Sequence, residues 1–369
     1  MKNRVEKLFL AVLFFCLVAG SPFGCQKESG SGGEAKTPDK TIIAKKELKA
    51  PEKAAEPPAA PVAQAASSPV EAFNRTTLIR ASVGNGEGQI GVFAGANEEK
   101  ERVPQALALT GDGGIAVIDN ENDRVLKFDK EGKFSGVLVA KEARRWFDIT
   151  ELLDGKLVAF DVQKSSLVFV NDTGGIEKSV ILPPKLRNFS GFYASKTALV
   201  LRVTDRSYKI TDIGDLKEGA IEKKHIVSLN ALPTSQSDKY ITARKTKTGE
   251  KEIGLVEIFE GDNAKEPSFS FEVQPPLEKA LLGSVTYLGG DKEGDIFVRI
   301  EMLVGEQPIE VKRYVRRYTK EGKENGTIEI PSDTLGAPLS DIRIGADGAV
   351  FALLPYKDRV EVIKWTPVK

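Results

Sequence analysis

A turn followed by a short apolar strand recurs along this chain at a nearly constant interval. In its clearest copy, the alternating run at residues 106–109 enters a turn at 111–114, and the apolar run 115–118 follows. A polar loop leads to a third run at 124–128, which ends in a Lys-Glu-Gly turn. Short strands with period-two patterning and Gly/Asp turns form antiparallel meanders. One meander cannot bury its own faces, so further copies are expected.

The copies follow along the rest of the chain. Their anchor residues, by subtraction 42, 41, 42, 56 and 54 residues apart, are Asp112, Asp154, Ser195, Ser237, Glu293 and Asp347. A glycine that closes the third strand also recurs, at Gly132, Gly174, Gly214 and Gly322. The unit after Ser237 lacks that glycine in register. A period of roughly 40 to 45 residues is that of propeller blades. The sequence therefore predicts an all-β, six-bladed β-propeller with four antiparallel strands in each blade.

The last blade needs a strand from elsewhere in the chain. Residues 340–344, 349–354 and 359–365 supply only three strands, and residues 77–83 can supply the missing outer one. Such a seam would remove an otherwise open sheet edge. We therefore expect the N-terminal strand to close the ring, and the propeller domain to comprise residues 76–369. We expect a monomer.

The first unit resembles an NHL repeat. It supplies the motif's proline, its Asp-Gly turn, an apolar strand that ends in Asp, an Asn-x-Arg step and a final Asp-x-x-Gly; the matching residues are Pro104, Asp112, Gly113, Asp119, Asn122, Arg124, Asp129 and Gly132. Later units keep only the turn and the apolar run, so beyond the first blade the resemblance is to NHL- or TolB-like propellers in general. NHL families include binding scaffolds and metal-dependent enzymes. The enzymes rely on histidine ligands, and this chain has only His225.

The N-terminus reads as an export signal. Three basic residues precede an apolar segment at 8–20, which is too short for a bilayer span of roughly 20 residues. Residues 21–25 then resemble the lipobox of bacterial lipoproteins, although Pro22 stands where that family has leucine. The resemblance implies a signal peptide at 1–24, a palmitate-bearing lipid anchor on Cys25 and, because Gln26 is not aspartate, sorting to the outer membrane. The alternative is cleavage near Gly20, with Cys25 left as a free thiol.

Residues 25–75 read as a tether between the anchor and the propeller. The segment 29–33 is Gly/Ser-rich, and 45–70 is dominated by Ala, Pro, Lys and Glu, with little apolar surface to bury. Such a composition stays disordered. The whole chain has 53 basic and 53 acidic residues. This balance argues against nucleic-acid binding, which needs a clustered basic footprint.

Two loops invite a ligand interpretation. Residues 84–88 are glycine-rich, but no Gly-Lys-Ser/Thr follows, so a mobile loop is expected there. The other loop follows the apolar run of the first unit and carries oxygen ligands suitable for calcium: Asp119, Asn120, Asn122 and Asp123. The favoured interpretation is a turn that hydrogen-bonds itself, so no cofactor is expected and calcium stays the alternative.

The run at 312–318 interleaves basic and aromatic residues and could suggest a polyanion site. It aligns with the third strand of the first unit. We expect a third strand of the fifth blade, with Tyr314 on one face and Arg313 and Val315 on the other.

The best candidate binding surface lies on the loops that enter each blade and those that join its second and third strands. Exposed Trp and Arg are enriched at binding hot spots. The predicted residues are Arg144, Arg145, Trp146 and Arg187, with Asp161, Asp205 and Arg206 from the second set of loops. The alternative is that Trp146 and Phe189 pack between blades.

These features favour a membrane-anchored lipoprotein of the bacterial envelope, whose propeller binds a protein or cell-wall partner without catalysis. The tether, the balanced charge and the single histidine support it. The alternative is a calcium-assisted hydrolase or lyase with an acidic site in the propeller channel.

Overall fold

A computed structural model of the chain describes residues 73–368, apart from 96–99, 140–144, 153, 172, 195–197, 204–205, 235–238, 262–263, 337 and 339. These residues form six sheets, each built on a four-strand antiparallel meander, and one of the sheets has a short fifth strand that is parallel to its neighbour. The six-bladed propeller expected from the repeats is confirmed. The predicted signal peptide, Cys25 and the tether as far as residue 72 lie outside the described residues. No helix in the described part of the chain is long and apolar enough to cross a membrane.

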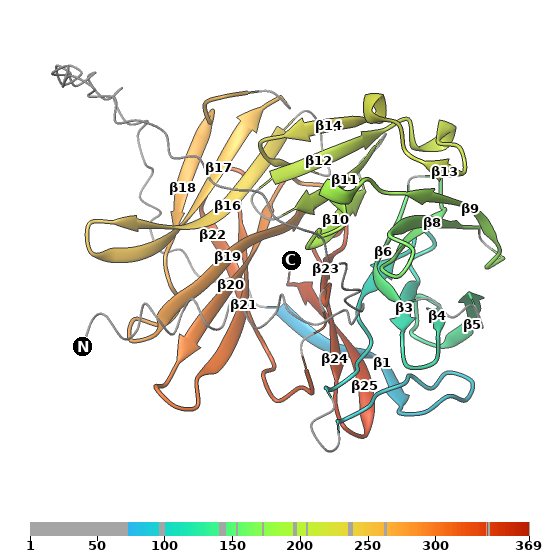
Figure 1. Cartoon of the computed structure of the whole chain (residues 1–369). Helices are drawn as coiled ribbons and strands as arrows, with labels where there is room; N and C mark the ends of the chain where they lie inside the picture. The colour runs from blue at the N-terminus through green and yellow to red at the C-terminus, as the bar shows by residue number, and fades with distance from the viewer. Residues whose placement is uncertain are drawn as a thin grey trace, which may run out of the picture. The chain divides into compact units, whose positions relative to one another are not determined.

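The blades follow one another around the ring in chain order (Figure 1). Blades 1 and 2 contain β2 (Leu107–Leu109), β3 (Ile115–Asp119), β4 (Arg124–Phe128) and β5 (Phe134–Val139), then β6 (Trp146–Glu151), β7 (Leu157–Asp161), β8 (Ser166–Val170) and β9 (Ile176–Ile181). Blade 3 contains β10 (Gly191–Ala194), β11 (Ala198–Val203), β12 (Arg206–Thr211) and β14 (Ile226–Leu229). The short β13 (Gly219–Ala220) adds to the outer edge of blade 2 beside β9.

Blades 4 to 6 complete the ring. Blade 4 contains β15 (Leu232–Pro233), β16 (Lys239–Thr248), β17 (Lys251–Glu260) and β18 (Phe269–Val273), and blade 5 contains β19 (Leu281–Gly290), β20 (Ile296–Val304), β21 (Glu310–Tyr318) and β22 (Glu324–Ile330). Blade 6 contains β23 (Ile342–Ile344), β24 (Val350–Pro355), β25 (Arg359–Pro367) and β1 (Phe73–Ser82). The first strand of each blade lines the channel. We call the face where these strands begin, and where second and third strands join, the mouth face.

The seam predicted from the sequence is present. β1 pairs antiparallel with β25 from Phe73 opposite Pro367 to Ser82 opposite Arg359, and the two strands lie side by side in Figure 1. The strand begins three residues before the boundary expected at residue 76. Ile79 and Ala81 of β1 are buried with Val360 and Val362 of β25 in one apolar cluster. The seam therefore fills a core as well as covering a sheet edge.

The recurrent closing glycine has a physical cause. Gly132 and Gly174 have φ of +80° and +85°, in the left-handed region that side chains rarely adopt. A Cβ added to Gly132 would overlap the carbonyl oxygen of Leu78 in the preceding blade's outer strand, and one added to Gly174 would overlap that of Leu138. At these two turns glycine is required because the turn of one blade presses against the backbone of the previous blade. Gly322 instead approaches the side chain of Phe271, and Gly214, predicted to close a third strand, lies in a 3-10 turn with open space around it, so the explanation does not extend to blade 3.

The basic and aromatic run of blade 5 is structural, as expected. It forms β21, with Tyr314 packed in the core between blades 4 and 5 and Val315 packed in the core between blades 5 and 6. Arg313, on the same face as Val315, is 9% exposed and forms an ion pair with the buried Asp341. The alternation of the strand thus assigns each side chain to one of the two neighbouring blades.

The NHL-like residues of blade 1 hold the chain that follows β1. Asp119 is fully buried and accepts hydrogen bonds from Asn122 (2.8 Å), Arg124 (2.9 Å) and the backbone N–H of Gly91 (3.0 Å). Arg124 also donates to the carbonyl oxygens of Asn85, Gly86 and Gln89 at 2.9–3.3 Å. The glycine-rich segment that we expected to be a mobile loop is therefore fastened to blade 1 by these hydrogen bonds.

Candidate functional site

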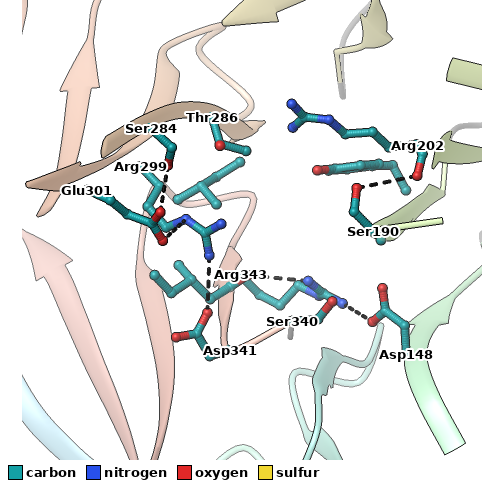
Figure 2. Close-up of a pocket in the computed structure, with 14 residues that line it drawn as sticks. Asp148, Ser190, Arg202, Ser284, Thr286, Arg299, Glu301, Ser340, Asp341 and Arg343 are labelled. Atoms are coloured by element: carbon teal, nitrogen blue, oxygen red, sulfur yellow. Dashed lines mark hydrogen bonds and ion pairs between the residues drawn. The ribbon is translucent and has the colours of Figure 1, made fainter. Parts of the chain in front are cut away.

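A polar pocket of about 380 Å³ lies in the channel, close to the mouth face. Its walls come from blades 2, 3, 5 and 6: Asp148 from β6; Ser190, Gly191, Tyr193 and Arg202 around β10 and β11; Ser284, Thr286, Leu288, Arg299 and Glu301 from β19 and β20; and residues 340–343 at the start of β23. Figure 2 shows charged side chains from three sides converging on this space. The ring therefore brings together residues that are up to 195 positions apart in sequence.

One ion pair crosses from blade 6 to blade 2. A guanidinium nitrogen of Arg343 donates to Asp148 Oδ1 at 2.6 Å and to the carbonyl oxygen of Ile149 at 3.2 Å. Asp148 is fully buried. Blade 1 stands between these two blades. The ion pair therefore passes in front of β2, the short inner strand of blade 1, and fixes one wall of the pocket (Figure 2).

A second group of charges joins blades 5 and 6. Arg299 lies 3.6 Å from Glu301 Oε1 and 3.6 Å from Asp341 Oδ1. Ser284 donates to Glu301 Oε2 at 2.7 Å. Asp341 accepts a short hydrogen bond from Arg313. Burial raises the pKa of the Asp341 carboxyl, while the guanidinium groups of Arg313 and Arg299 oppose that rise. Each carboxylate of the pocket therefore has an arginine partner.

Arg202 takes part in none of these ion pairs. It is the fifth residue of β11 and is partly buried. In Figure 2 its side chain extends across the pocket from blade 3 toward Thr286 of blade 5. Its guanidinium forms no hydrogen bond or ion pair with any described residue, whereas the three pocket carboxylates are matched by Arg343, Arg299 and Arg313. Among the described residues, Arg202 is thus the one arginine of the pocket lining that has no carboxylate partner.

The Arg299 Nε group is already engaged by the protein. It is buried 3.6 Å from Glu301 Oε1, as an ion pair without a hydrogen bond. Arg202 is therefore the donor that the pocket offers to a ligand. An anionic group in the pocket could accept from the Arg202 guanidinium, since arginine binds carboxylates and phosphates through its fork of donors. The site can therefore hold and orient an anion.

The pocket is adjacent to a second cleft of about 560 Å³ beside blade 4. Arg202 lines both spaces. The cleft is also lined by Ser207 of blade 3, by residues 241–244 of β16 and by Tyr287 of β19. Blade 4 permits this opening because its inner strand β15 has only 2 residues. The channel pocket and the cleft thus share Arg202, beside the short inner strand of blade 4.

The predicted binding residues that the structure describes lie outside this pocket. Arg145, Arg187 and Arg206 are exposed, where β6, β10 and β12 begin on the mouth face, and Arg187 Nε donates to the carbonyl oxygen of Leu182 at 3.2 Å. Asp161 is fully buried at the end of β7 and accepts from the backbone N–H groups of two following residues. Arg144 and Asp205 lie outside the described residues. A role for these residues in binding stays a prediction.

Trp146 corrects the sequence interpretation. It is 1% exposed and packs in the core between blades 1 and 2. Its backbone exchanges two hydrogen bonds with the Asn120 side chain, at 2.6 and 3.0 Å. Phe189 is also buried, against Phe160. Both aromatics therefore pack between strands and blades, because β6 begins at Trp146 and the residue belongs to a strand rather than to a loop.

The loop considered for calcium is engaged in hydrogen bonds with the protein itself. Asp119 bonds to Asn122 and Arg124, and Asn120 bonds to the backbone of Trp146. Within the described residues, no group of three or more His, Cys, Asp and Glu side chains is placed to hold a metal ion. The single histidine, His225, has its Nδ1 3.4 Å from Asp212 Oδ2.

Sequence reasoning missed the pocket residues, although a weak signal was present. Asp148, Thr286 and Arg343 are polar residues inside the first strands of blades 2, 5 and 6, where the neighbouring positions are apolar. First strands line the channel of a propeller, so polar residues within them are candidates for a channel site. Arg202 lies at the end of a second strand and carries no such signal.

No protein-family model matches the sequence, and no curated protein matches it. Among solved structures, virginiamycin B lyase from Staphylococcus aureus is 12% identical with a TM-score of 0.40, covering 80% of this chain and 100% of that chain. A DUF4221 family member from Bacteroides vulgatus is 9% identical with a TM-score of 0.43, covering 81% of this chain and 99% of that chain. These similarities are too low to bear on ligand or activity.

Proposed function

We propose that this chain is a lipid-anchored protein of the bacterial envelope, with the outer membrane as the favoured location, and that its propeller binds an anionic group of a protein or cell-wall partner in the channel without catalysis. The observation that carries the binding role is the uncompensated Arg202 guanidinium facing a pocket of about 380 Å³. A buried or half-buried arginine without a counter-charge gains most from a ligand carboxylate or phosphate.

The arrangement of the pocket supports binding over catalysis. Asp148 is held by Arg343, and Asp341 by Arg313. A general acid or base needs a carboxyl or imidazole group within reach of the reacting atom and free to exchange a proton with it. Here the carboxylates are occupied as acceptors of arginine, which fixes the walls of the pocket. A calcium-assisted hydrolase or lyase is therefore the less favoured candidate.

The position of β1 supports the anchored arrangement. Phe73 pairs with Pro367, at the end of the ring opposite the mouth face, because β25 runs away from its turn with β24. The chain that precedes Phe73 therefore joins the ring on the face opposite the pocket. A lipid on Cys25 would therefore be joined to the ring through that face rather than through the mouth face, and the tether would raise the effective concentration of the protein near a partner in the envelope.

Lipidation is tested at Cys25 itself. The variant Cys25→Ser is expected to lose all incorporation of labelled palmitate and to move from the membrane fraction to the soluble fraction, since no other cysteine follows the signal segment. Labelling and fractionation of cells that produce the full chain measure both effects. If the variant stays in the membrane fraction and keeps the label, the anchor assignment is wrong.

Anion binding is tested at Arg202. Citrate, glutarate and inorganic phosphate, titrated against the propeller by calorimetry, should include at least one ligand whose affinity falls about tenfold or more in Arg202→Gln, which corresponds to about 1.4 kcal/mol. The matched control is Arg75→Gln, because Arg75 is an exposed arginine of β1 far from the channel. Equal affinities for the three proteins, or no binding of any of these anions, would count against the proposed function.

A further inference from the structure

Blade 4 lacks most of its inner strand. β15 has 2 residues and pairs only through Leu232 opposite Ile241 and Pro233 opposite Tyr240. The neighbouring strand β16 is 10 residues long and pairs with β17 along its whole length. Among the described residues, 242–248 of β16 therefore have a partner strand on one side only. This leaves an open sheet edge on the channel side of blade 4, in the half of the strand nearest the mouth face.

The hydrogen-bonding groups on that edge can be assigned. Thr234 N–H donates to the carbonyl oxygen of Lys239, so Lys239 directs its backbone toward the inner edge. Backbone groups alternate between the two edges of a strand. Ala243, Lys245 and Lys247 consequently present their N–H and C=O groups to the open edge, and within the described part of the chain no backbone hydrogen bond reaches them from that side.

The edge borders the cleft of about 560 Å³ described above. The cleft is lined by residues from both faces of β16, with Ile241 and Ala243 on one face and Thr242 and Arg244 on the other, so it reaches around the inner edge of the strand. Tyr287 also lines the cleft, and its buried hydroxyl has no hydrogen-bond partner among the described residues. Unused donors and acceptors at an accessible edge favour addition of a strand.

The charged side chains along the edge indicate which kind of peptide strand it can bind. Arg244 pairs with Glu257 at 3.1 Å, and Lys245 pairs with Glu252 at 2.8 Å. The two charges that form no ion pair with any described residue are Arg202 at one end of the edge and Lys247 at the other. Both are positive. A strand that carries carboxylates complements the edge, whereas a basic strand would be repelled.

We infer that the open edge of β16 binds an extended acidic peptide of a partner protein, which adds antiparallel to residues 242–248 as the missing inner strand of blade 4. This inference rests on the proposed function, because Arg202 serves both the channel pocket and the cleft. Backbone hydrogen bonds to Ala243, Lys245 and Lys247 supply the pairing, and acidic side chains contact Arg202 and Lys247. A strand of about seven residues, ~23 Å when extended, covers the edge.

The probe is the peptide acetyl-Thr-Glu-Val-Glu-Val-Glu-Thr-amide, and the readout is amide hydrogen exchange in the full chain. Without peptide, the amides of Ala243, Lys245 and Lys247 should exchange quickly, while those of Thr242 and Thr246, which face β17, exchange slowly. Saturating peptide should slow exchange of the first three by about tenfold or more. The same peptide N-methylated at every glutamate and valine, which keeps the charge but cannot donate, should leave exchange unchanged.

Matched variants separate pairing from charge. Lys247→Gln should lower the affinity for the peptide modestly. Lys247→Pro also removes an edge N–H that is unpaired in the free protein, and it should abolish the protection from exchange. Proline is tolerated at such edge positions, and an unchanged melting temperature confirms that the variant folds. If Arg202→Gln loses citrate or phosphate binding but the peptide protects none of the three amides, the β-strand inference fails and the anion site stands. If neither the binding of the anions nor the binding of the peptide depends on Arg202, the β-strand inference and the anion site both fail. Protection without peptide that disappears in a variant lacking residues 1–72 would identify the chain's own N-terminal segment as the occupant and overturn the partner assignment.

Discussion

A propeller that begins at Gly84, and so lacks β1, is expected to lose its cooperative unfolding transition. The deletion removes nine paired positions from β25 and opens the core that holds Ile79 and Ala81. Burial of a side chain such as Ile79 contributes about 2–3 kcal/mol, and each lost hydrogen bond removes about 1 kcal/mol. Since whole domains are stable by only about 5–15 kcal/mol, the loss is comparable with the total. Thermal unfolding followed by circular dichroism measures it.

Two comparisons make this deletion specific to the seam. A variant that begins at Phe73 removes only the chain before β1 and should melt like the full protein. A synthetic peptide of residues 73–83, added to the shorter variant, should restore part of the transition, because it can re-form the pairing with β25. An unchanged melting temperature for the variant that begins at Gly84 would show that the ring does not depend on closure by β1.

The variant Arg313→Met is expected to lower the free energy of unfolding by about 3–5 kcal/mol near neutral pH, because removing one partner of a buried ion pair leaves the other charge uncompensated. Asp341 is 1% exposed and would retain only the longer contact with Arg299 at 3.6 Å. The matched control is Lys312→Met on the same strand, whose side chain is partly exposed and pairs at 3.7 Å with the exposed Glu329. That substitution should lower the free energy of unfolding by less than about 1 kcal/mol. Urea unfolding measures both.

The pH dependence of this loss has a defined sign. Burial already raises the pKa of Asp341, and Arg313 opposes that rise. Without Arg313, the folded-state pKa rises further above the unfolded value, so the group favours the folded state when protonated and disfavours it as the pH increases through the folded pKa. The deficit of Arg313→Met relative to the parent protein should therefore shrink toward acidic pH. If the loss of unfolding free energy is constant with pH, or is no larger than that of Lys312→Met, the ion pair between Arg313 and Asp341 does not stabilise the fold as predicted.

The fold could be predicted from the sequence because it depends on local and repeated features. The glycines at Gly132 and Gly174 mark positions where only glycine fits, and the period between them sets the blade. The missing fourth strand of the last blade follows from counting strands, and the structure places β1 there. The strand that contains Tyr314 and Val315 shows the same logic, since alternation alone assigns its two faces.

The candidate site could not be predicted in the same way. Arg202, Asp148 and Arg343 meet only because the ring closes. Asp148 and Arg343 carry the weak signal of a polar residue within an apolar first strand, but no local signal marks Arg202. Trp146 shows the opposite error, since an aromatic beside two arginines was interpreted as an exposed loop residue and is the first residue of a buried strand. The irregular fourth unit, which lacks the closing glycine in register, was the place where the sequence pattern was weakest. It is also the blade with the short inner strand.

The route by which the chain enters the ring has a mechanical consequence. A partner held at the mouth face and a membrane anchor upstream of Phe73 would pull on the propeller from opposite ends of β1. The hydrogen bonds between β1 and β25 lie perpendicular to the strands, so a force directed along β1 loads all of the pairs from Phe73 to Ser82 together. A force applied at one end of the ladder and perpendicular to the strands would instead break the hydrogen bonds one after another. In a protein anchored and bound in this way, the seam that closes the ring would resist the pull in shear.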